Sequence, residues 1–155
     1  MKILLLSDSH RCMERMERAV ALEQPDAICH MGDHLADAKR LKVGNVPLYA
    51  VPGNCDFSGM DTPLTKVVDF NGVSVMLTHG HAFGVKQGLL TLELAAKERG
   101  VDVVAFGHTH MAVAIARSNL WMVNPGSCGG GSHWSYGVLT IEAGVVSCNI
   151  IEMEG

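Results

Sequence analysis

The chain begins Met1-Lys2-Ile3-Leu4-Leu5-Leu6-Ser7-Asp8-Ser9-His10, and this stretch carries the two features on which the fold depends. Residues 3–6 are all apolar, which is typical of a buried strand, and we expect the strand over residues 2–7. The run has four apolar residues before Ser7, too few for the core of a secretory signal sequence. A carboxylate and an imidazole follow directly. We therefore predict a buried strand whose carboxyl end opens into a site containing Asp8 and His10.

Strands and helices alternate in the first third of the chain. Apolar residues at helical spacing predict a helix over residues 11–23, and Pro25 ends it. A short strand over 27–30, a helix over 34–41 and a strand over 47–51 follow. This β-α-β-α-β order is typical of a largely parallel sheet with helices on its faces.

The second half of the chain is richer in strands. Asn71-Gly72 is a strong hairpin signal between strands over residues 65–70 and 73–78. A helix is expected over 86–99 and a strand over 101–106. Turn signals separate the remaining expected strands, which cover residues 112–117, 120–123, 136–141 and 145–150. We expect these late strands to form a second sheet packed face to face with the first, within a single domain over residues 1–155.

Composition argues against several classes of protein. A chain of 155 residues that is 48% hydrophobic has enough apolar surface for one core, and no apolar run approaches the roughly 20 residues that cross a bilayer. The net charge of −4, without a run of Lys or Arg, argues against a broad nucleic-acid-binding surface. The five cysteines show no CxxC spacing, so we expect a reducing cytoplasm rather than a disulfide scaffold.

Five short clusters of metal-ligand residues lie at the ends of expected strands. They are Asp8-Ser9-His10, Gly32-Asp33-His34, Gly53-Asn54-Cys55-Asp56, His79-Gly80-His81 and Gly107-His108-Thr109-His110. Ligands of parallel α/β sheets sit at the carboxyl ends of the strands, so the five clusters are expected to converge. Carboxylate, amide and imidazole groups suit a pair of divalent transition-metal ions, and such pairs attack phosphate esters.

In this order, the five clusters resemble the motifs of the calcineurin-like metallophosphoesterases. The short chain and the form Gly53-Asn54-Cys55-Asp56 are most similar to a small bacterial and archaeal branch, the YfcE- and MJ0936-type phosphodiesterases. The resemblance extends over essentially the whole chain. It implies a four-layer α/β/β/α sandwich of two mixed sheets, in agreement with the two sheets expected from the strand pattern.

The same resemblance implies two metal ions and a ligand for each position. The first ion would be held by Asp8, His10 and His110, the second by Asn54, His79 and His108, and Asp33 would bridge them. The expected reaction is hydrolysis of a small phosphodiester by a hydroxide that bridges the two ions. The resemblance favours manganese, while iron, cobalt, nickel and zinc suit the same donors.

The proton donor for the leaving group has several candidates. Many family members carry His after the metal-binding Asn, where this chain has Cys55, a poorer acid towards an alkoxide. His81 is one substitute and His34 another. The catalytic set on this interpretation is Asp33, Asn54, Cys55 and His81.

Other functions are compatible with the same pattern. A phosphomonoesterase would use the same metals, and the fold also serves as a non-catalytic scaffold in the Vps29 subunit of the retromer complex. All seven ligand positions are filled here, which favours an enzyme over the scaffold. Because several family members self-associate, a homo-oligomer is also expected.

Four further groups have open roles. For His30 and His133 we expect hydrogen-bonded structural roles, with His30 alternatively orienting a ligand. Asp56 either occupies a turn or orients its neighbours. The turn Asn124-Pro125-Gly126-Ser127 either only reverses the chain or also closes one side of the pocket.

Overall fold

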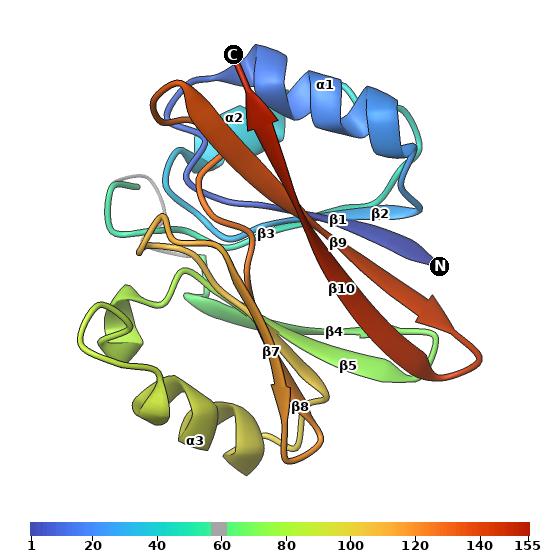
Figure 1. The fold of residues 1–155 in the computed structure, drawn as a ribbon, viewed down its shortest axis with the longest axis vertical. Helices are drawn as coiled ribbons and strands as arrows, with labels where there is room; N and C mark the ends of the chain where they lie inside the picture. The colour runs from blue at the N-terminus through green and yellow to red at the C-terminus, as the bar shows by residue number, and fades with distance from the viewer. Residues whose placement is uncertain (57–61) are drawn as a thin grey trace.

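The computed structural model describes residues 1–56 and 62–155. Strand β1 (Lys2–Leu6) lies in the middle of the first sheet (Figure 1). Its side chains alternate between two cores: Ile3 and Leu5 face the second sheet, whereas Leu4 and Leu6 face helix α1 (Met13–Glu23). Both faces of β1 are therefore buried, which explains why the opening run is apolar without alternation.

The described strands of the first sheet follow the order β10-β9-β1-β2-β3. Strands β2 (Ala27–His30) and β3 (Leu48–Ala50) run parallel to β1, and helices α1 and α2 (Leu35–Arg40) lie in the connections. The long hairpin of β9 (His133–Glu142) and β10 (Val145–Glu154) pairs with the other edge of β1, in antiparallel direction.

The position of this hairpin corrects the expectation that all the late strands join the second sheet. Strand β1 is buried on both faces, and without β9 the backbone groups along one of its edges would lack partners. Pairing with β9 satisfies those groups, for example between Leu5 and Gly137. The last two strands therefore complete the first sheet.

The second sheet contains strands from the middle of the chain, in the order β4-β5-β6-β8-β7. They are β4 (Thr65–Phe70), β5 (Val73–Thr78), β6 (Val103–Ala105), β7 (Val113–Arg117) and β8 (Leu120–Asn124). Strands β5, β6 and β8 are parallel, and the edge strands β4 and β7 are antiparallel to their neighbours. The turns at Asn71-Gly72 and Ser118-Asn119 have positive φ at both residues, as type I′ hairpins require, which confirms both turn predictions.

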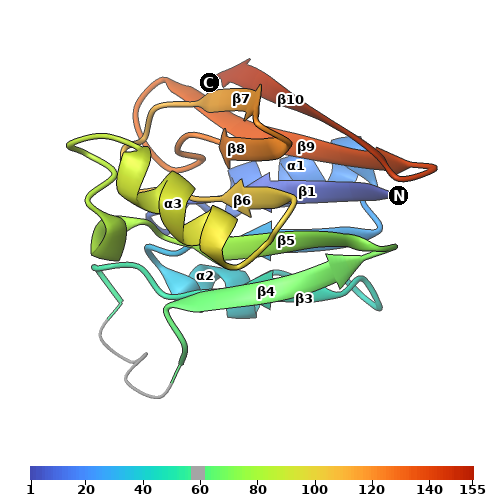
Figure 2. The same cartoon turned by 90° about the horizontal axis from the view of Figure 1, so that it is seen from below.

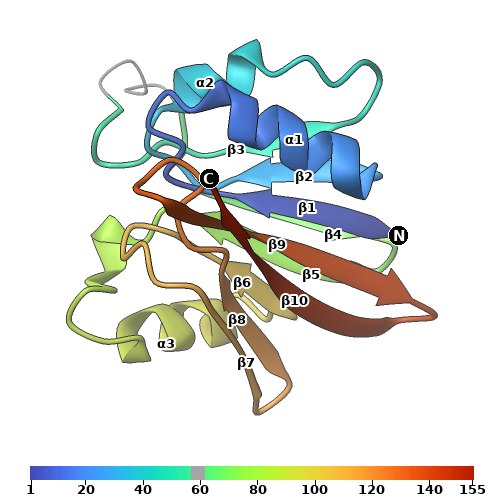
Figure 3. The ribbon, with the colours of Figure 1, turned by 45° about the horizontal axis from the view of Figure 1, so that its top comes forward.

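Three hydrophobic cores separate four layers. The first lies between the sheets and includes Leu5 and Val75, and the second lies between the first sheet and α1, around Met16. The third lies between the second sheet and helix α3 (Leu90–Glu98), around Leu92. Figures 2 and 3 show α1 and α2 over the outer face of one sheet and α3 over that of the other. The expected α/β/β/α sandwich of two mixed sheets is confirmed.

Local backbone conformation explains where the helices differ from expectation. Helix α1 begins at Met13 because His10 and Arg11 adopt positive φ angles of 45° and 69°. Helix α3 begins at Leu90, and a short 3-10 helix over His81–Phe83 lies between it and β5. Among the described helices, none is long and apolar enough to cross a membrane.

Candidate metal centre

The five clusters meet at one edge of the two sheets. Each candidate ligand loop follows a different strand: Asp8 after β1, Asp33 after β2, Asn54 after β3, His79 after β5 and His108 after β6. Backbone hydrogen bonds join neighbouring loops. The N–H of Asp8 donates to the carbonyl of Gly32 at 2.9 Å, and the N–H of Gly107 donates to that of His79 at 3.0 Å.

One group of potential metal ligands consists of Asp8, His10 and His110, whose donor atoms lie within 4.8 Å of one another. His110 Nε2 is 3.1 Å from Asp8 Oδ1, and His10 Nε2 is 3.4 Å from His110 Nε2. Asp8 is fully buried, and its other oxygen accepts hydrogen bonds from the Ser7 hydroxyl and the His108 N–H. Asp8 Oδ1 therefore faces the two imidazoles. These are the residues expected at the first metal position.

A second group consists of Asp8, Asp33 and His79, again with donor atoms within 4.8 Å of one another. His79 Nε2 is 3.5 Å from Asp33 Oδ2 and 3.9 Å from Asp8 Oδ1. His108 Nδ1 lies 3.2 Å from His79 Nε2, next to this group. Asp8 is common to both groups, whereas the family resemblance implies Asp33 as the shared ligand.

The hydrogen bonds of His79 show that a cation fits this arrangement. His79 Nδ1 is 2.7 Å from the carbonyl oxygen of Met31. A carbonyl can only accept, so Nδ1 carries the proton and the neutral imidazole presents a lone pair at Nε2. That lone pair points into a group of carboxylate oxygens, which repel it. A divalent metal ion bound between them would remove the repulsion, and the carbonyl holds the ring in the orientation that this requires.

The same contacts shift pKa values in the metal-free protein. Burial acts to lower the pKa of His79, but the hydrogen bond to Asp33 and the charge of Asp8 outweigh burial and raise it. For Asp33, burial acts to raise the pKa, but His79 and the Cys55 backbone N–H hold it well below its usual range. The raised pKa of His79 means that the two carboxylates favour positive charge between them, which is the charge that a metal ion would supply.

A buried chain of hydrogen bonds braces the loops that carry the ligands. The Gly32 N–H donates to His30 Nδ1 at 3.2 Å, so His30 Nε2 carries the proton and donates to Ser9 Oγ at 3.1 Å. The Ser9 hydroxyl donates to Asp37 Oδ2 at 2.8 Å, and the Arg11 N–H donates to the same oxygen at 2.7 Å. The chain connects the loop after β1, the end of β2 and helix α2.

Sequence reasoning found only part of this brace. His30 is buried and makes the hydrogen bonds that its structural role requires, and it also orients the loop of Asp33. Burial lowers the pKa of His30 to about 4, so the imidazole is neutral at pH 7. Asp37 was missed, although a carboxylate beside Ala38 on the apolar face of a short helix is a signal of a buried, hydrogen-bonded role. His133, by contrast, is exposed on β9.

The loop after β3 contacts the centre through its backbone. The Cys55 N–H donates to Asp33 Oδ1 at 3.0 Å. The side-chain amide of Asn54 donates to the Cys55 thiol at 3.7 Å, and both side chains are exposed. The structure therefore places Asn54 beside the centre, and its role as a metal ligand stays a prediction.

Asp56 orients this loop rather than merely occupying a turn. Its carboxylate accepts the N–H of Leu35 at 2.8 Å and the N–H of Gly53 at 2.7 Å, which ties the loop to the start of α2. A Cβ at Gly53 would overlap the Asp33 carboxylate. Glycine is therefore required at this position by the close approach of the two loops.

The candidate proton donors surround the centre. The His81 ring centroid lies 5.5 Å from that of His79, and the His34 centroid lies 5.0 Å from that of His10. His81 Nδ1 is buried and has no hydrogen-bond partner in the described part of the chain. Burial, followed by the charge of His79, lowers the pKa of His81. Burial and the neighbouring Asp33 raise the pKa of the Cys55 thiol.

The turn after β8 holds two of the ligand loops from the other side. The Ser127 hydroxyl donates to the backbone carbonyl of Asp8 at 2.8 Å. The Asn124 amide donates to the carbonyl of Gly107 at 3.1 Å and to the Thr109 hydroxyl at 2.9 Å. The turn expected at residues 124–127 thus also positions Asp8 and the Gly107–His110 loop.

Comparison with known families agrees with this geometry. The profile of the calcineurin-like phosphoesterase superfamily domain matches residues 1–144. The chain therefore belongs to the calcineurin-like phosphoesterase superfamily, and with it to the phosphoric ester hydrolases.

Individual relatives place the chain further. It is 34% identical over 129 residues to the probable metallophosphoesterase YsnB of Bacillus subtilis, covering 82% of this chain and 75% of that protein. It is 33% identical to phosphodiesterase YfcE of Escherichia coli, over 90% of this chain and 87% of that protein. A solved structure of an archaeal phosphodiesterase superposes with a TM-score of 0.77 at 25% identity, covering 97% of this chain and 100% of that one.

Vps29 shares the fold. The crystal structure of Chaetomium thermophilum Vps29 superposes with a TM-score of 0.77 at 16% identity, covering 99% of this chain and 97% of that one. At this identity the likeness concerns the fold alone.

Proposed function

We propose that this protein is a metal-dependent phosphodiesterase acting on a small phosphodiester. The observation that carries the proposal is the buried Asp8 carboxylate, which belongs to two adjacent groups of metal-ligand atoms. Two divalent ions bound there would supply Lewis acidity towards the phosphate oxygens and, at neutral pH, hydroxide for in-line attack on phosphorus. The likeness to phosphodiesterase YfcE supports a diester over a monoester.

Seven side chains are assigned as ligands in this proposal. The first ion would take Asp8, His10 and His110, and the second would take Asn54, His79 and His108, with Asp33 between them. The Asp8 carboxylate also belongs to the group of Asp33 and His79, so it would contribute to both positions. With both carboxylates ionised, two divalent ions leave the site at roughly +2, which attracts a phosphodiester monoanion. We propose manganese, because the mixture of oxygen and nitrogen donors suits it and the family resemblance favours it.

The protein's own groups position the ligands and handle the leaving-group proton. The bond from His79 to Met31 fixes the tautomer that presents Nε2, and the bond from Ser127 fixes the backbone of Asp8. The raised pKa of Cys55 keeps its thiol protonated at pH 7, so a proton is available there, although a thiol gives it up slowly to an alkoxide. Diesters with good leaving groups are therefore the expected substrates.

Hydrolysis of matched aryl esters tests the proposal. Metal-free protein reloaded with Mn²⁺ should cleave bis(4-nitrophenyl) phosphate faster than 4-nitrophenyl phosphate, and chelation should abolish both activities. Asp33→Ala should lose the activity, whereas Asp69→Ala, at an exposed acid in the β4–β5 hairpin, should keep it. A preference for the monoester would favour a phosphatase. Loaded protein that cleaves neither ester would favour a non-catalytic role like that of the Vps29 fold.

A further inference from the structure

A cavity of about 570 Å³, the α3 cavity, lies between the loop before α3 and the loop after β6. Its apolar walls belong to the core between the second sheet and α3, so the cavity is on the outer side of that sheet. The loop before α3 contributes Val85, Lys86 and Leu89, and the loop after β6 contributes Phe106, Thr109 and Met111.

The walls of the α3 cavity are continuous with the loops that carry the candidate ligands. Thr109 stands between two of these ligands in the sequence, His108 and His110. Val85, from the other loop, packs against Gly80, which directly follows a third candidate ligand: a Cβ on Gly80 would lie 2.9 Å from Val85 Cγ2. A phosphate bound at the candidate metal centre would therefore have one of its ester groups next to this cavity.

Lys86 places a positive charge beside both the α3 cavity and His108. Burial, followed by the charges of His79 and Lys86, lowers the pKa of His108, so the ammonium group lies within electrostatic reach of this imidazole. Lys86 is exposed, and it forms no ion pair with any residue in the ranges 1–56 and 62–155. A phosphate oxygen suits such a cation, because hydrogen bonds between charged groups are stronger than neutral ones.

The remaining walls are mostly apolar and partly open to solvent. Val85 and Phe106 are buried, whereas Met111 is 73% exposed, and Leu89 and Val113 are half-buried. Binding sites for small molecules typically have such apolar walls with a few polar groups that fix the orientation, and volumes of roughly 300–1,000 Å³. The α3 cavity therefore suits an apolar group that is joined to an anion.

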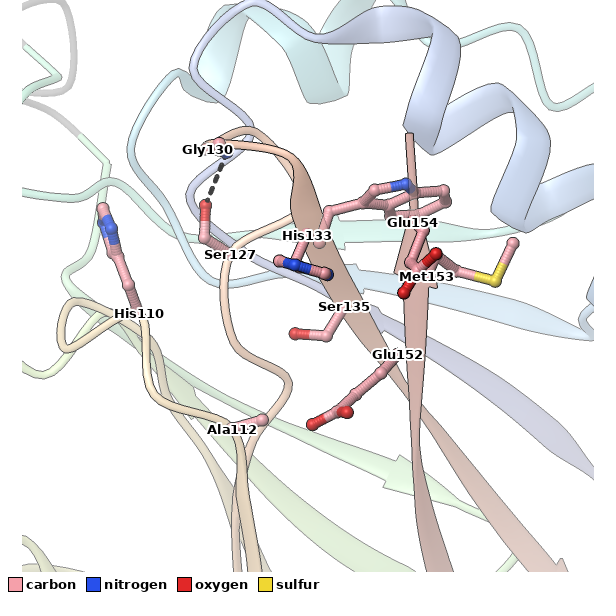
Figure 4. A pocket seen from close by; sticks show the side chains of 11 residues that line it. His110, Ala112, Ser127, Gly130, His133, Ser135, Glu152, Met153 and Glu154 are labelled. Atoms are coloured by element: carbon pink, nitrogen blue, oxygen red, sulfur yellow. Dashed lines mark hydrogen bonds between the residues drawn. The ribbon is translucent and has the colours of Figure 1, made fainter.

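A second cavity near the centre has a different lining. Its volume is about 810 Å³, and His110 and Ala112 lie on one side of it. Figure 4 shows the hairpin side, which carries the exposed polar residues His133, Glu152 and Glu154. An apolar group there would take these side chains out of water without offering them partners, which costs free energy. Of the two cavities, the α3 cavity is the better match for an apolar ester group.

From these observations we infer that the α3 cavity binds one ester group of the substrate, that this group is an aryl or alkyl group, and that Lys86 contacts the phosphate. The inference rests on the proposed phosphodiesterase activity, which places the phosphate at the candidate metal ligands. Carbon atoms of the ester pack against Leu89, Met111 and Val113. A sugar or glycerol group would instead bring hydroxyls against apolar walls that offer them few partners.

Binding of three phosphonates tests the inference without relying on catalysis, because these compounds have no ester bond to hydrolyse. They are phenylphosphonate, methylphosphonate and 2,3-dihydroxypropylphosphonate, and calorimetry with the Mn²⁺-loaded protein measures their Kd values. Phenylphosphonate should bind roughly tenfold more tightly than methylphosphonate, because its ring buries apolar surface. The dihydroxypropyl compound should bind no more tightly than methylphosphonate.

Met111→Ser tests the apolar wall. Because this side chain is 73% exposed, its removal leaves the core intact. The substitution should reduce the preference for phenylphosphonate over methylphosphonate by roughly threefold and leave the Kd of methylphosphonate unchanged. Val145→Ser, at an apolar residue that is 69% exposed at the far end of the β9–β10 hairpin, should change neither value.

Lys86→Met tests the cation, because it keeps an apolar stem and removes the charge. All three phosphonates should bind roughly fivefold more weakly, the upper end for an exposed ion pair, and the preference for the phenyl group should remain. Lys42→Met, at an exposed residue between α2 and β3, should leave all three Kd values unchanged.

The outcomes separate this inference from the proposed function. Equal Kd values for phenyl- and methylphosphonate, a phenyl preference that Met111→Ser leaves intact, or unchanged binding by Lys86→Met would overturn the inference. Weaker self-association of Met111→Ser with an unchanged phenyl preference would assign the apolar wall to a contact between two copies of the chain instead. Hydrolysis of bis(4-nitrophenyl) phosphate by the same samples tests the proposed function: if wild type cleaves no diester, that function falls and the inference with it.

Discussion

His79 and Met31 join the two sheets at the metal-ligand edge: the imidazole after β5 donates from Nδ1 to the carbonyl after β2 at 2.7 Å. One hydrogen bond therefore performs two functions. It satisfies a fully buried carbonyl, and it directs Nε2 towards Asp33 and Asp8. The two functions can be separated by substitution.

His79→Asn should keep the structural bond and lose the ligand, because the amide nitrogen of Asn occupies the position of Nδ1 and no atom replaces Nε2. His79→Ala should lose both, and the unpaired Met31 carbonyl should lower the free energy of unfolding by a further amount of about 1–3 kcal/mol. Both variants lose the interaction with Asp33, so their difference isolates the Met31 bond. Urea unfolding of the metal-free variants and Mn²⁺ calorimetry measure the two effects. Equal stability of the two variants would contradict the structural role of the hydrogen bond to Met31.

Asp37 should control metal affinity without touching the metal. Asp37→Ala removes the acceptor for the Ser9 hydroxyl and the Arg11 N–H, on either side of His10. We expect Mn²⁺ affinity to fall by about 10- to 100-fold, as for other residues that orient ligands, with activity largely restored at saturating Mn²⁺.

A matched control for Asp37 exists at the other end of β1. Asp26 accepts the N–H of Lys2 at 2.7 Å, the same kind of bond, far from the centre along β1. Asp26→Ala should reduce stability and leave Mn²⁺ affinity unchanged. If the two variants bind Mn²⁺ equally well, the brace has no part in positioning the ligands.

Stability of the metal-free protein should fall between pH 6.5 and pH 4 through His30. Burial lowers the pKa of His30 from 6.5 to about 4. In this window His30 therefore binds a proton in the unfolded chain and stays neutral in the folded chain. The loss is at most about 3 kcal/mol, since one pKa unit corresponds to about 1.4 kcal/mol. His30→Gln should be less stable at pH 7 and should lose less stability between pH 6.5 and 4 than wild type. An unchanged slope in urea unfolding would show that His30 is not the group responsible.

Cys55→His should change the dependence of rate on the leaving group. An imidazole donates a proton to an alkoxide more readily than a thiol, so alkyl diesters should be cleaved faster and aryl diesters at an unchanged rate. His81→Gln, in wild type and in the variant, shows whether His81 already serves as the donor. Equal rates for wild type and Cys55→His across the leaving-group series would count against a donor at position 55.

Local patterns were sufficient to predict most elements. Strands β2, β4 and β5 have the expected bounds because Pro25, Asn71 and Gly72 mark their ends in the sequence. The sheet to which β9 and β10 belong depends on which edge of β1 needs a partner, and that is a tertiary property that no local pattern contains.

The ligand residues could be predicted because carboxylates and imidazoles that repeatedly follow strands form an unusual sequence pattern, and this pattern indicates a metal site. Their supports were harder to find. Asp37 and Ser127 act through hydrogen bonds to residues distant along the chain, so neither carries a spacing signal. The sharing of Asp8 between two groups depends on side-chain geometry, and sequence order alone does not distinguish Asp8 from Asp33 as the shared ligand.

Titration of metal-free protein with Mn²⁺, followed by calorimetry and by hydrolysis of bis(4-nitrophenyl) phosphate in the same samples, tests the shared Asp8 most directly. Wild type should bind two ions per chain, with activity appearing as the second binds. His10→Gln should retain one ion, whereas Asp8→Asn should weaken both and lose activity. A single ion in active wild-type protein, or two ions and full activity in Asp8→Asn, would contradict a two-metal centre built on Asp8.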